Sequence, residues 1–515
     1  MSAQVQLSYV EQAYDRGRED FEHIVGYLDS EEAAAMSHSE LERELEAKGR
    51  ELMRLLLQEH LNRRGPGRCE DAVTGADSVK RTEQRKHDRK LETVFGTVTV
   101  NRVGYGHEGF DSLHPLDAEL NLPDEKYSLE LRRRVAEHAA KTSFEDTVRS
   151  VARYTGAEVA KRQVEELVGR AAVDFDAFYQ IRQGVASTGP ILAVSVDGKG
   201  IVMRTEDLRE QTRKAAEART QKMGKRLSKG EKKNAKRMAT VAAVYTIDPL
   251  VRTPEQVVAD TGSRLARAKR PRPEQKRVWA SVEKPPEQII AQVFGEARQR
   301  DPTGEKTWVA LVDGNKPQIR HLRKMARKEK IDLTIVVDII HVIEYLWKAA
   351  RVFYPESGPD LENWVSHRLI EILRGKAGLM AGGMRRSATR QKLAADVRKP
   401  VDICAGYLLN HSAYLRYDRY LAQGLPIATG VIEGACRHLV KDRMDVTGAR
   451  WSLNGAEAVL RMRALCSSGD FDEYWRFHEA CEYKRTHQSR YAGGIVPTIS
   501  SSQRAKNTTR LKVIK

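Results

Sequence analysis

Cysteine is scarce in this sequence, with five residues among 515. The five lie far apart and include no Cys-x-x-Cys pair, so their spacing indicates neither a zinc site nor a disulfide framework. They are Cys69, Cys404, Cys436, Cys466 and Cys481. We expect reduced thiols with structural roles.

Long hydrophobic runs are also absent. The longest apolar stretch, LTIVVDIIHVIEYLW, is interrupted by Asp338, His341 and Glu344, whereas a membrane span needs about 20 mostly apolar residues. The N-terminal segment MSAQVQLSYVEQAYDRGRED lacks the basic stretch followed by an apolar one that marks a secretory signal. We therefore expect a cytoplasmic protein with no membrane partner.

Positive charge, by contrast, is in excess. The 88 Lys and Arg residues against 71 Asp and Glu residues give a formal net charge of +17, which favours a polyanionic partner, nucleic acid before any other. A length of 515 residues predicts two to four domains.

The first part of the chain, residues 1–120, is predicted to be helical with one β-hairpin. Apolar residues recur at helical spacing between Glu31 and Asn62, and Leu52, Leu55 and Leu56 form a stripe that should be buried. The later segment LETVFGTVTVNRVGYG alternates apolar and polar residues around a glycine, which is typical of a β-hairpin.

Residues 121–185 are predicted to contain a helix-turn-helix. The helical segments SFEDTVRSVARYT and EVAKRQVEELVGRAA are separated by Gly156 and Ala157. In such a unit the second helix enters the major groove by its first residues, which here are Lys161, Arg162 and Gln163. A helical domain without DNA contact accounts for the same pattern.

From residue 186 to 350 the pattern changes to strands alternating with helices. The predicted strands are ILAVSVDG, ATVAAVYTI, WVALVDG and LTIVVD, with GIVMRT as a further hairpin strand and KPQIRHLRKMARKEK as a helix. An antiparallel run followed by alternating helices and strands predicts an RNase H-like core, an α+β or α/β fold in which helices flank a mixed sheet.

Three further regions complete the predicted organisation. They are a helical insertion at 351–423, the final helices of the core at 424–482, and a flexible basic tail at 483–515. Two segments are strongly basic: 209–237 has 12 Lys or Arg against 3 Glu, and 264–277 has 7 against one. They are either solvated or in contact with the DNA backbone.

Phosphodiester chemistry at neutral pH requires an activated hydroxyl and neutralisation of the leaving oxygen, which two Mg²⁺ ions bound by carboxylates supply. Asp197 and Asp313 each end a predicted strand before a glycine, and the two strands should be neighbours. A lone Asp-Gly is more often a turn, so the pair carries the prediction. Asp338 competes with Asp313, but capping the following helix explains Asp338 without catalysis.

Glu433 is the candidate third acid. It lies in the helical run IEGACRHLVKDRM, where Arg437 and Lys441 follow at four and eight residues and should share its face as phosphate ligands. A surface Glu–Arg pair is the alternative account. Glu457 is the alternative acid, although its apolar-striped helix suits packing better.

These motifs together resemble the bacterial insertion-sequence DDE transposases of the ISKra type. The resemblance extends from the N-terminal helices to about Cys481 and depends on VSVDGKG, WVALVDGNK, VVDIIHVIEYLW and TGVIEGACRHLVKDRMDVTGARWSLNGAEAVLRMRAL. It implies an RNase H-like core, Mg²⁺ or Mn²⁺ dependence with Asp197, Asp313 and Glu433 as metal ligands, cleavage at element ends, and strand transfer into target DNA by a homo-oligomer.

The sequence departs from a related transposase group at one signature, Tyr-x2-Arg-x3-Glu-x6-Lys. Position 429 is Thr, and Lys441 comes one residue late, which leaves the phosphate-binding roles of Arg437 and Lys441 open. Two other functions fit the same features: an RNase H-like nuclease or resolvase that cuts without joining, and a DNA-binding protein derived from a transposase without catalysis.

Overall fold

The computed structural model describes residues 14–182, 189–218, 235–262 and 270–500. The chain forms two compact units, one made of Met1–Phe178 with Phe471–Lys515 and the other of Tyr179–Asp470. The first unit is therefore assembled from two separate stretches of chain. Within the part described, no helix is both long and apolar enough to cross a membrane.

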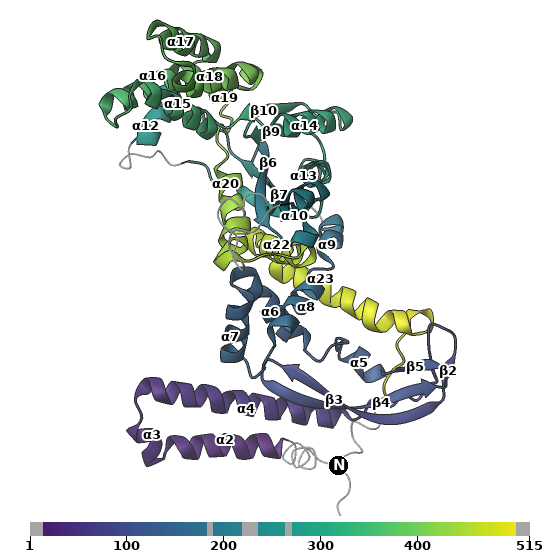
Figure 1. Ribbon diagram of the computed structural model, residues 1–515. Helices are drawn as coiled ribbons and strands as arrows, with labels where there is room; N and C mark the ends of the chain where they lie inside the picture. The colour runs from purple at the N-terminus through teal and green to yellow at the C-terminus, as the bar shows by residue number, and fades with distance from the viewer. Residues whose placement is uncertain (1–13, 183–188, 219–234, 263–269, 501–515) are drawn as a thin grey trace, which may run out of the picture. The chain divides into compact units, whose positions relative to one another are not determined.

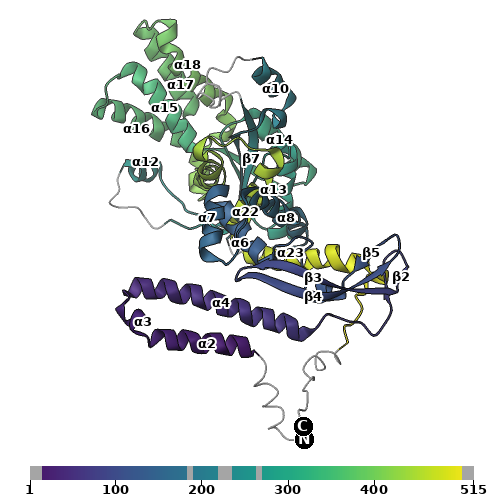
Figure 2. The same cartoon turned by 60° about the horizontal axis from the view of Figure 1, so that its bottom comes forward.

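Two long helices begin the first unit and run side by side (Figures 1 and 2). They are α2 (Asp15–Leu28) and α4 (His38–Arg64), joined by the short α3 (Glu31–Ala35). A capping box starts α4, because the Glu40 carboxylate accepts a hydrogen bond from the Ser37 backbone N–H at 2.9 Å. The predicted stripe of Leu52, Leu55 and Leu56 is only half-buried, since α2 and one strand cover just part of α4.

The predicted β-hairpin is confirmed. Strands β3 (Glu83–Thr93) and β4 (Gly96–His107) are antiparallel, and Thr93 pairs with Gly96 at the turn. Gly96 has a φ of +123°, which glycine adopts without steric cost. The other strands of this unit are β1 (Val73–Thr74), β2 (Lys80–Arg81) and β5 (Phe110–Leu113).

Three helices pack against one another in the predicted helix-turn-helix region: α6 (Leu129–Lys141), α7 (Phe144–Tyr154) and α8 (Lys161–Ala171). A Cβ added to Gly156, between α7 and α8, would lie 2.4 Å from the Phe95 carbonyl oxygen, so this turn requires glycine. The short helices α5 (Pro115–Glu119) and α9 (Phe175–Ile181) flank the three.

The C-terminal helix α23 (Phe471–Glu482) belongs to the same unit and is tied to α6 by buried charges. The fully buried guanidinium of Arg132 donates to Glu125 at 2.8 Å and to Glu482 at 2.8 Å, and it also contacts the His478 ring at 3.0 Å. On the other side of that ring, the Asp174 carboxylate lies 2.7 Å from Nδ1. Residues that are far apart in the sequence therefore share one ionic network.

The chain beyond α23 differs from the flexible tail expected over 483–515. Residues 483–494 form the short helical turns η5 (Tyr483–His487), η6 (Gln488–Arg490) and η7 (Ala492–Gly494). Tyr491 and Ile499 are buried and form isolated β-bridges to Gly75 and Cys69. Excess basic charge does not prevent folding here, because these apolar side chains add to the core under β4. Residues 501–515 lie outside the described part.

The second unit contains a five-stranded mixed sheet of order β10-β9-β6-β7-β8. Its strands are β6 (Ile191–Val202), β7 (Lys236–Ile247), β8 (Glu274–Ser281), β9 (Thr307–Val312) and β10 (Leu333–Val337). The β6-β7-β8 run is antiparallel, whereas β9 is parallel to β6 and β10 is parallel to β9. The mixed α/β fold predicted from the sequence is confirmed at this level.

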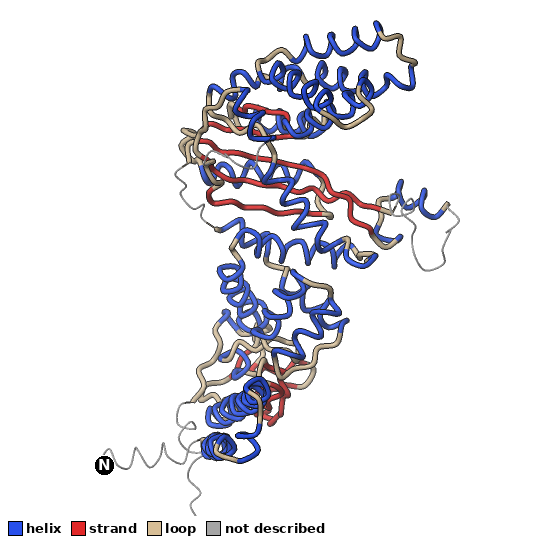
Figure 3. Tube along the Cα trace, turned by 90° about the vertical axis from the view of Figure 1, so that its left-hand side faces the viewer, coloured by secondary structure: helices blue, strands red, loops and turns tan. Residues whose placement is uncertain are grey.

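Helices pack against this sheet, and Figure 3 shows the strands running between them. Helices α13 (Pro286–Arg300) and α14 (Lys316–Lys328) contact the sheet in Figure 1 to the right of β6, and α20 (Gly430–Ala435) contacts it to the left. The chain continues from α20 through the π-helical η3 (Cys436–Lys441), α21 (Asp442–Met444) and η4 (Val446–Gly448) to α22 (Leu453–Ser468).

Several helices follow β10, and most of them lie in the predicted helical insertion at 351–423. They are α15 (Ile339–Phe353), α16 (Pro359–Leu373), α17 (Ala377–Arg390), α18 (Ala395–Asn410), η2 (Ser412–Tyr414) and α19 (Tyr417–Ala422). Three short helices, η1 (Thr205–Asp207), α10 (Glu210–Glu217) and α12 (Pro254–Gly262), lie between β6 and β8 in the sequence. Both basic segments lie partly outside the described residues, at 219–234 and 263–269.

Candidate metal centre at the strand ends

The register of three parallel strands places three aspartates at one level of the sheet. Ser195 pairs with Leu311, so Asp197 and Asp313 each stand two residues farther along neighbouring strands. Val312 pairs with Val337, so Asp313 and Asp338 each follow a paired residue. Strands β9 and β10 end here, so Asp313 and Asp338 stand at the edge of the sheet. Asp197 lies level with them, although β6 continues to Val202.

Asp338 is fully buried and held by two hydrogen bonds. One carboxylate oxygen accepts from the Ile340 backbone N–H at 2.9 Å, which caps α15 as predicted. The other accepts from the Thr429 hydroxyl. Burial raises the pKa of the Asp338 carboxyl although both hydrogen bonds favour its charged form. Burying the Asp338 carboxyl group therefore costs free energy of folding.

Capping alone does not describe Asp338, because it belongs to a group that could hold a metal ion. One ligand atom each from Asp338, His341 and Glu433 lies within 4.8 Å of the others. Asp338 is buried, His341 half-buried and Glu433 exposed, so the group opens to solvent on the Glu433 side. This is the one such group of three or more found in the described residues.

Glu433 lies near several acidic side chains. Partial desolvation and then the Asp338 carboxylate raise the pKa of Glu433, and Asp197 adds to the same effect. The structure therefore brings Glu433 close enough to interact with Asp338 and Asp197. Asp313 is not part of the three-residue group.

Asp197 lies within β6 rather than at its end. Its carboxylate accepts a hydrogen bond from the Gly198 backbone N–H at 2.6 Å and another from the Cys436 thiol at 3.1 Å. Burial raises the pKa of that thiol, and the Asp197 charge raises it further, so Cys436 stays protonated and can donate. These two donors fix the direction of the carboxylate.

Asp313 is positioned by the helical insertion. Its carboxylate accepts from the Asn315 N–H at 2.8 Å, and its backbone carbonyl accepts from the Tyr407 hydroxyl at 2.9 Å. The His411 ring lies 2.8 Å from the carbonyl oxygen of Gly314, the next residue. Two side chains of α18 and the turn after it therefore hold the backbone on which Asp313 stands.

Replacing Gly314 by Ala should destabilise the second unit by about 1–2 kcal/mol. Gly314 has a φ of +92°, and a Cβ there would lie 2.9 Å from the Tyr407 hydroxyl and 3.1 Å from the His411 ring. Hydrogen exchange of the β9 amides in both proteins measures the difference, because it reports on this unit alone. Gly304→Ala is the matched control, because Gly304 also has a positive φ, +76°, but no neighbour near an added Cβ. Equal losses of stability in the two variants would show that the contacts of the added methyl group with Tyr407 and His411 have no effect.

Arg437 and Lys441 are exposed, as Glu433 is, and they follow it across a change of helix type. Residues 436–441 form a π-helical segment, whose i→i+5 hydrogen bonds add residues to each turn. The Arg437 guanidinium is exposed and lies 3.8 Å from Asp442. The phosphate-binding roles of Arg437 and Lys441 stay a prediction.

Glu457, the alternative acid, is buried on α22 and fully used in packing. Its carboxylate accepts from the Ser281 hydroxyl at 3.0 Å and from the Val282 backbone N–H at 2.9 Å, at the end of β8. This agrees with the packing role expected from its apolar-striped helix.

In the first unit, Lys161 and Arg162 are exposed at the start of α8, and Gln163 is half-buried. Their contact with DNA stays a prediction.

Sequence reasoning missed His341, Thr429, Cys436 and Tyr407 as parts of this site. The spacing Asp338-x-x-His341 was available in the sequence, because residues three apart share a helix face. The partners of the other three are far away in the sequence, so no local pattern indicates them.

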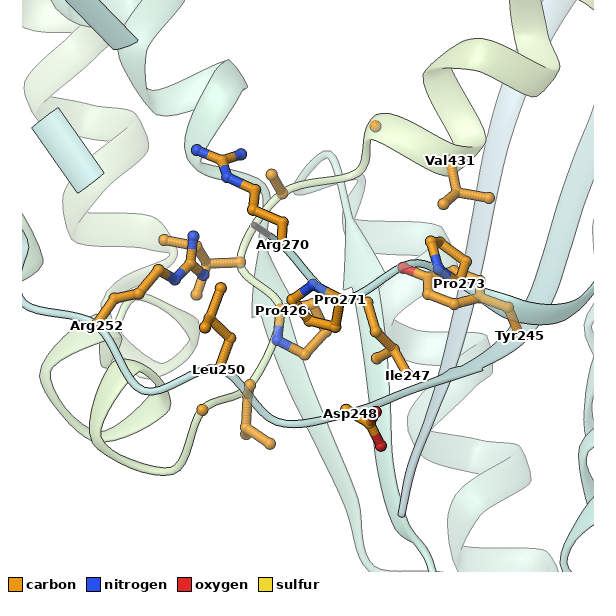
Figure 4. Close-up of a pocket in the computed structure, with 15 residues that line it drawn as sticks. Tyr245, Ile247, Asp248, Leu250, Arg252, Arg270, Pro271, Pro273, Pro426 and Val431 are labelled. Atoms are coloured by element: carbon orange, nitrogen blue, oxygen red, sulfur yellow. The ribbon is translucent and has the colours of Figure 1, made fainter. Parts of the chain in front are cut away.

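An apolar pocket of about 270 Å³ lies beside the start of α20 (Figure 4). Tyr245, Ile247 and Leu250 line it together with Pro271, Pro273 and Pro426, and Val431 comes from α20 itself. Asp248 is the one acidic residue of its lining. The pocket therefore lacks the converging carboxylates of the strand ends, which form the better candidate site.

Searches of protein-family models and of curated proteins found nothing that matches this chain.

Proposed function

We propose that this protein is a DNA transposase with an RNase H-like catalytic core, which cuts DNA at the ends of an insertion sequence and joins those ends to target DNA. The observation that carries the proposal is the meeting of Asp338, His341 and Glu433 beside the strand that bears Asp197. The β10-β9-β6-β7-β8 order, with β9 parallel to β6, is the arrangement expected of such a core. The sequence resemblance adds independent support.

The side chains at this edge fit divalent Mg²⁺ or Mn²⁺. Asp197, Asp338 and Glu433 offer hard oxygen ligands, and Asp313 stands at the same level of the sheet. Partial desolvation and then repulsion by the Asp338 carboxylate raise the pKa of Glu433, and a dication would neutralise this negative charge. Asp338 and Glu433, with Asp197 beside them, would hold the ions. Bound there, the ions would activate the attacking oxygen and stabilise the leaving one.

The residues around the acids prepare their geometry. Thr429 and the Ile340 N–H orient the Asp338 carboxylate, while Cys436 and the Gly198 N–H orient that of Asp197. Tyr407 and His411 hold the turn that carries Asp313. Supporting contacts of this kind fix ligands in place before substrate arrives, which a phosphoryl-transfer site requires.

Replacing Glu433 by Gln should remove strand transfer and weaken Mn²⁺ binding, since a neutral amide replaces a charged ligand of nearly equal shape. Strand transfer is measured with a labelled, pre-cut duplex that carries the inverted repeat flanking the gene, and Mn²⁺ binding is measured by calorimetry. Glu344→Gln is the matched control: Glu344 lies on α15, 3.8 Å from the His341 ring, but outside the three-residue group. It should retain most activity.

Three outcomes would contradict the proposal. Cleavage without joined product would identify a nuclease or resolvase. DNA binding with neither reaction, and without Mn²⁺ uptake, would identify a DNA-binding protein that lacks catalysis. Equal loss of activity in both variants would show that general charge near α15 matters, and not the proposed ligand.

A further inference from the structure

A basic groove runs along α14, next to the acidic strand ends. It has a volume of about 530 Å³ and is formed by α14 and by the residues that follow α18. Its lining comprises Lys316, Ile319, Arg320, Arg323, Lys324, Arg327, Asn410, His411 and Tyr414. We call it the α14 groove.

The charge of the α14 groove has one sign. Five of its nine lining residues are Lys or Arg, and none is Asp or Glu. Residues 316–328 contain six Lys or Arg and no acid, and the helix buries Gln318, Leu322 and Ala326 away from the groove. Folding thus gathers the cations on one side of a firmly packed helix.

Few contacts within the protein compensate this charge. Arg323 donates to the Tyr414 hydroxyl at 3.2 Å, a neutral partner. Among the described residues, no acidic side chain forms an ion pair with Arg320, Lys324 or Arg327. Like charges held close together destabilise the compact state unless an anion binds them. The groove therefore has the electrostatic character of a polyanion site.

The groove adjoins the candidate metal centre. Its first cation, Lys316, stands three residues after Asp313, and His411, which lines it, contacts the carbonyl oxygen of Gly314. Lys316 and Arg327 are 11 residues apart, about 16 Å along an α-helix. A DNA strand of that length carries roughly five phosphates.

We propose that the α14 groove binds the phosphate backbone of target DNA and leads it to the strand-end acids. The inference rests on the proposed function and names the substrate that this surface holds. Lys and Arg contacts to phosphate do not depend on the base sequence. A protein that inserts into varied target DNA requires contacts of this kind. End recognition would remain with the helix-turn-helix of the first unit.

The test replaces three groove cations together: Arg320→Gln, Lys324→Gln and Arg327→Gln. All three are exposed, and Gln is a good helix former, so the fold should be kept, which circular dichroism checks. Binding of a 30-base-pair random-sequence duplex is measured against salt concentration. Three lost phosphate contacts should reduce the log–log salt slope by about 2 to 3 and weaken binding at least tenfold at low salt.

A matched triple variant on the helical insertion is the control: Arg386→Gln, Arg390→Gln and Lys399→Gln. These residues are also exposed, and the change removes the same charge from the same unit. It should shift the salt slope by less than one.

An unchanged slope in the groove variant would overturn the proposal and favour an acidic protein partner for the same charges. Equal shifts in the two variants, or a loss confined to inverted-repeat DNA, would also overturn it. Because the measurement is binding, the result stands even if the wild-type protein joins no DNA, so failure of the proposed function is seen separately.

Discussion

Replacing Asp338 by Asn should abolish metal-dependent strand transfer while leaving the fold and DNA binding intact. The change removes a charge from the group that Asp338 forms with His341 and Glu433. Loss of one carboxylate ligand costs several kcal/mol of charge stabilisation, which is about a thousandfold or more in rate. The measurement is strand transfer of the labelled, pre-cut end beside a gel-shift on the same preparation.

The substitution is mild toward the fold. Asn caps helices as well as Asp does, so the bond from the Ile340 N–H to the side chain can persist. Asp313→Asn is measured in parallel, and we expect it to lose activity too, as the sequence-based triad requires. If Asp338→Asn stayed active and Asp313→Asn did not, Asp338 would be the simple helix cap that the sequence first indicated.

Replacing Arg132 by Met should destabilise the first unit by about 3–5 kcal/mol, because it leaves the carboxylates of Glu125 and Glu482 without their buried cation. Arg132 is fully buried between them, so water cannot take its place. Hydrogen exchange of the α6 amides should become roughly 100- to 5000-fold faster. Exchange reports on this unit alone, whereas a single melting curve would mix two units.

The matched control is Arg134→Met on the same helix. Arg134 pairs with Glu130 at 3.2 Å, but both side chains are more than 40% exposed, at 43% and 44%. Exposed pairs contribute about 0–1 kcal/mol, so exchange in this variant should change little. Similar acceleration in both variants would show that α6 tolerates no substitution, and that the buried network has no special role.

The sequence predicted most elements whose pattern is local. The hairpin of β3 and β4, the three helices from α6 to α8, and the strands ending near Asp313 and Asp338 all followed from periodicity and turn residues. GIVMRT was placed wrongly as a separate strand. Gly198 and Gly200 stand inside one long β6, because both pair with β7 and form no turn.

The candidate site was only partly predictable, because its contacts join distant residues. The strand-terminal aspartates were visible, but the choice between Asp313 and Asp338 depends on where α20 places Glu433. The π-helical segment after Ala435 was not predicted, because helical spacing alone gives no warning of it. Tyr491 and Ile499 show the same limit, since their burial needs partners near the other end of the chain.

The discontinuous first unit also sets an order for biosynthesis. Its N-terminal stretch is made first, yet Glu482 and His478, which surround Arg132, are translated only after the whole second unit. At roughly 5–20 residues per second, this delay is on the order of tens of seconds. The stretch that leaves the ribosome first is therefore the last to be completed. Its Arg132, paired only with Glu125, and its uncovered hairpin core are exposed to chaperones and proteases during that interval.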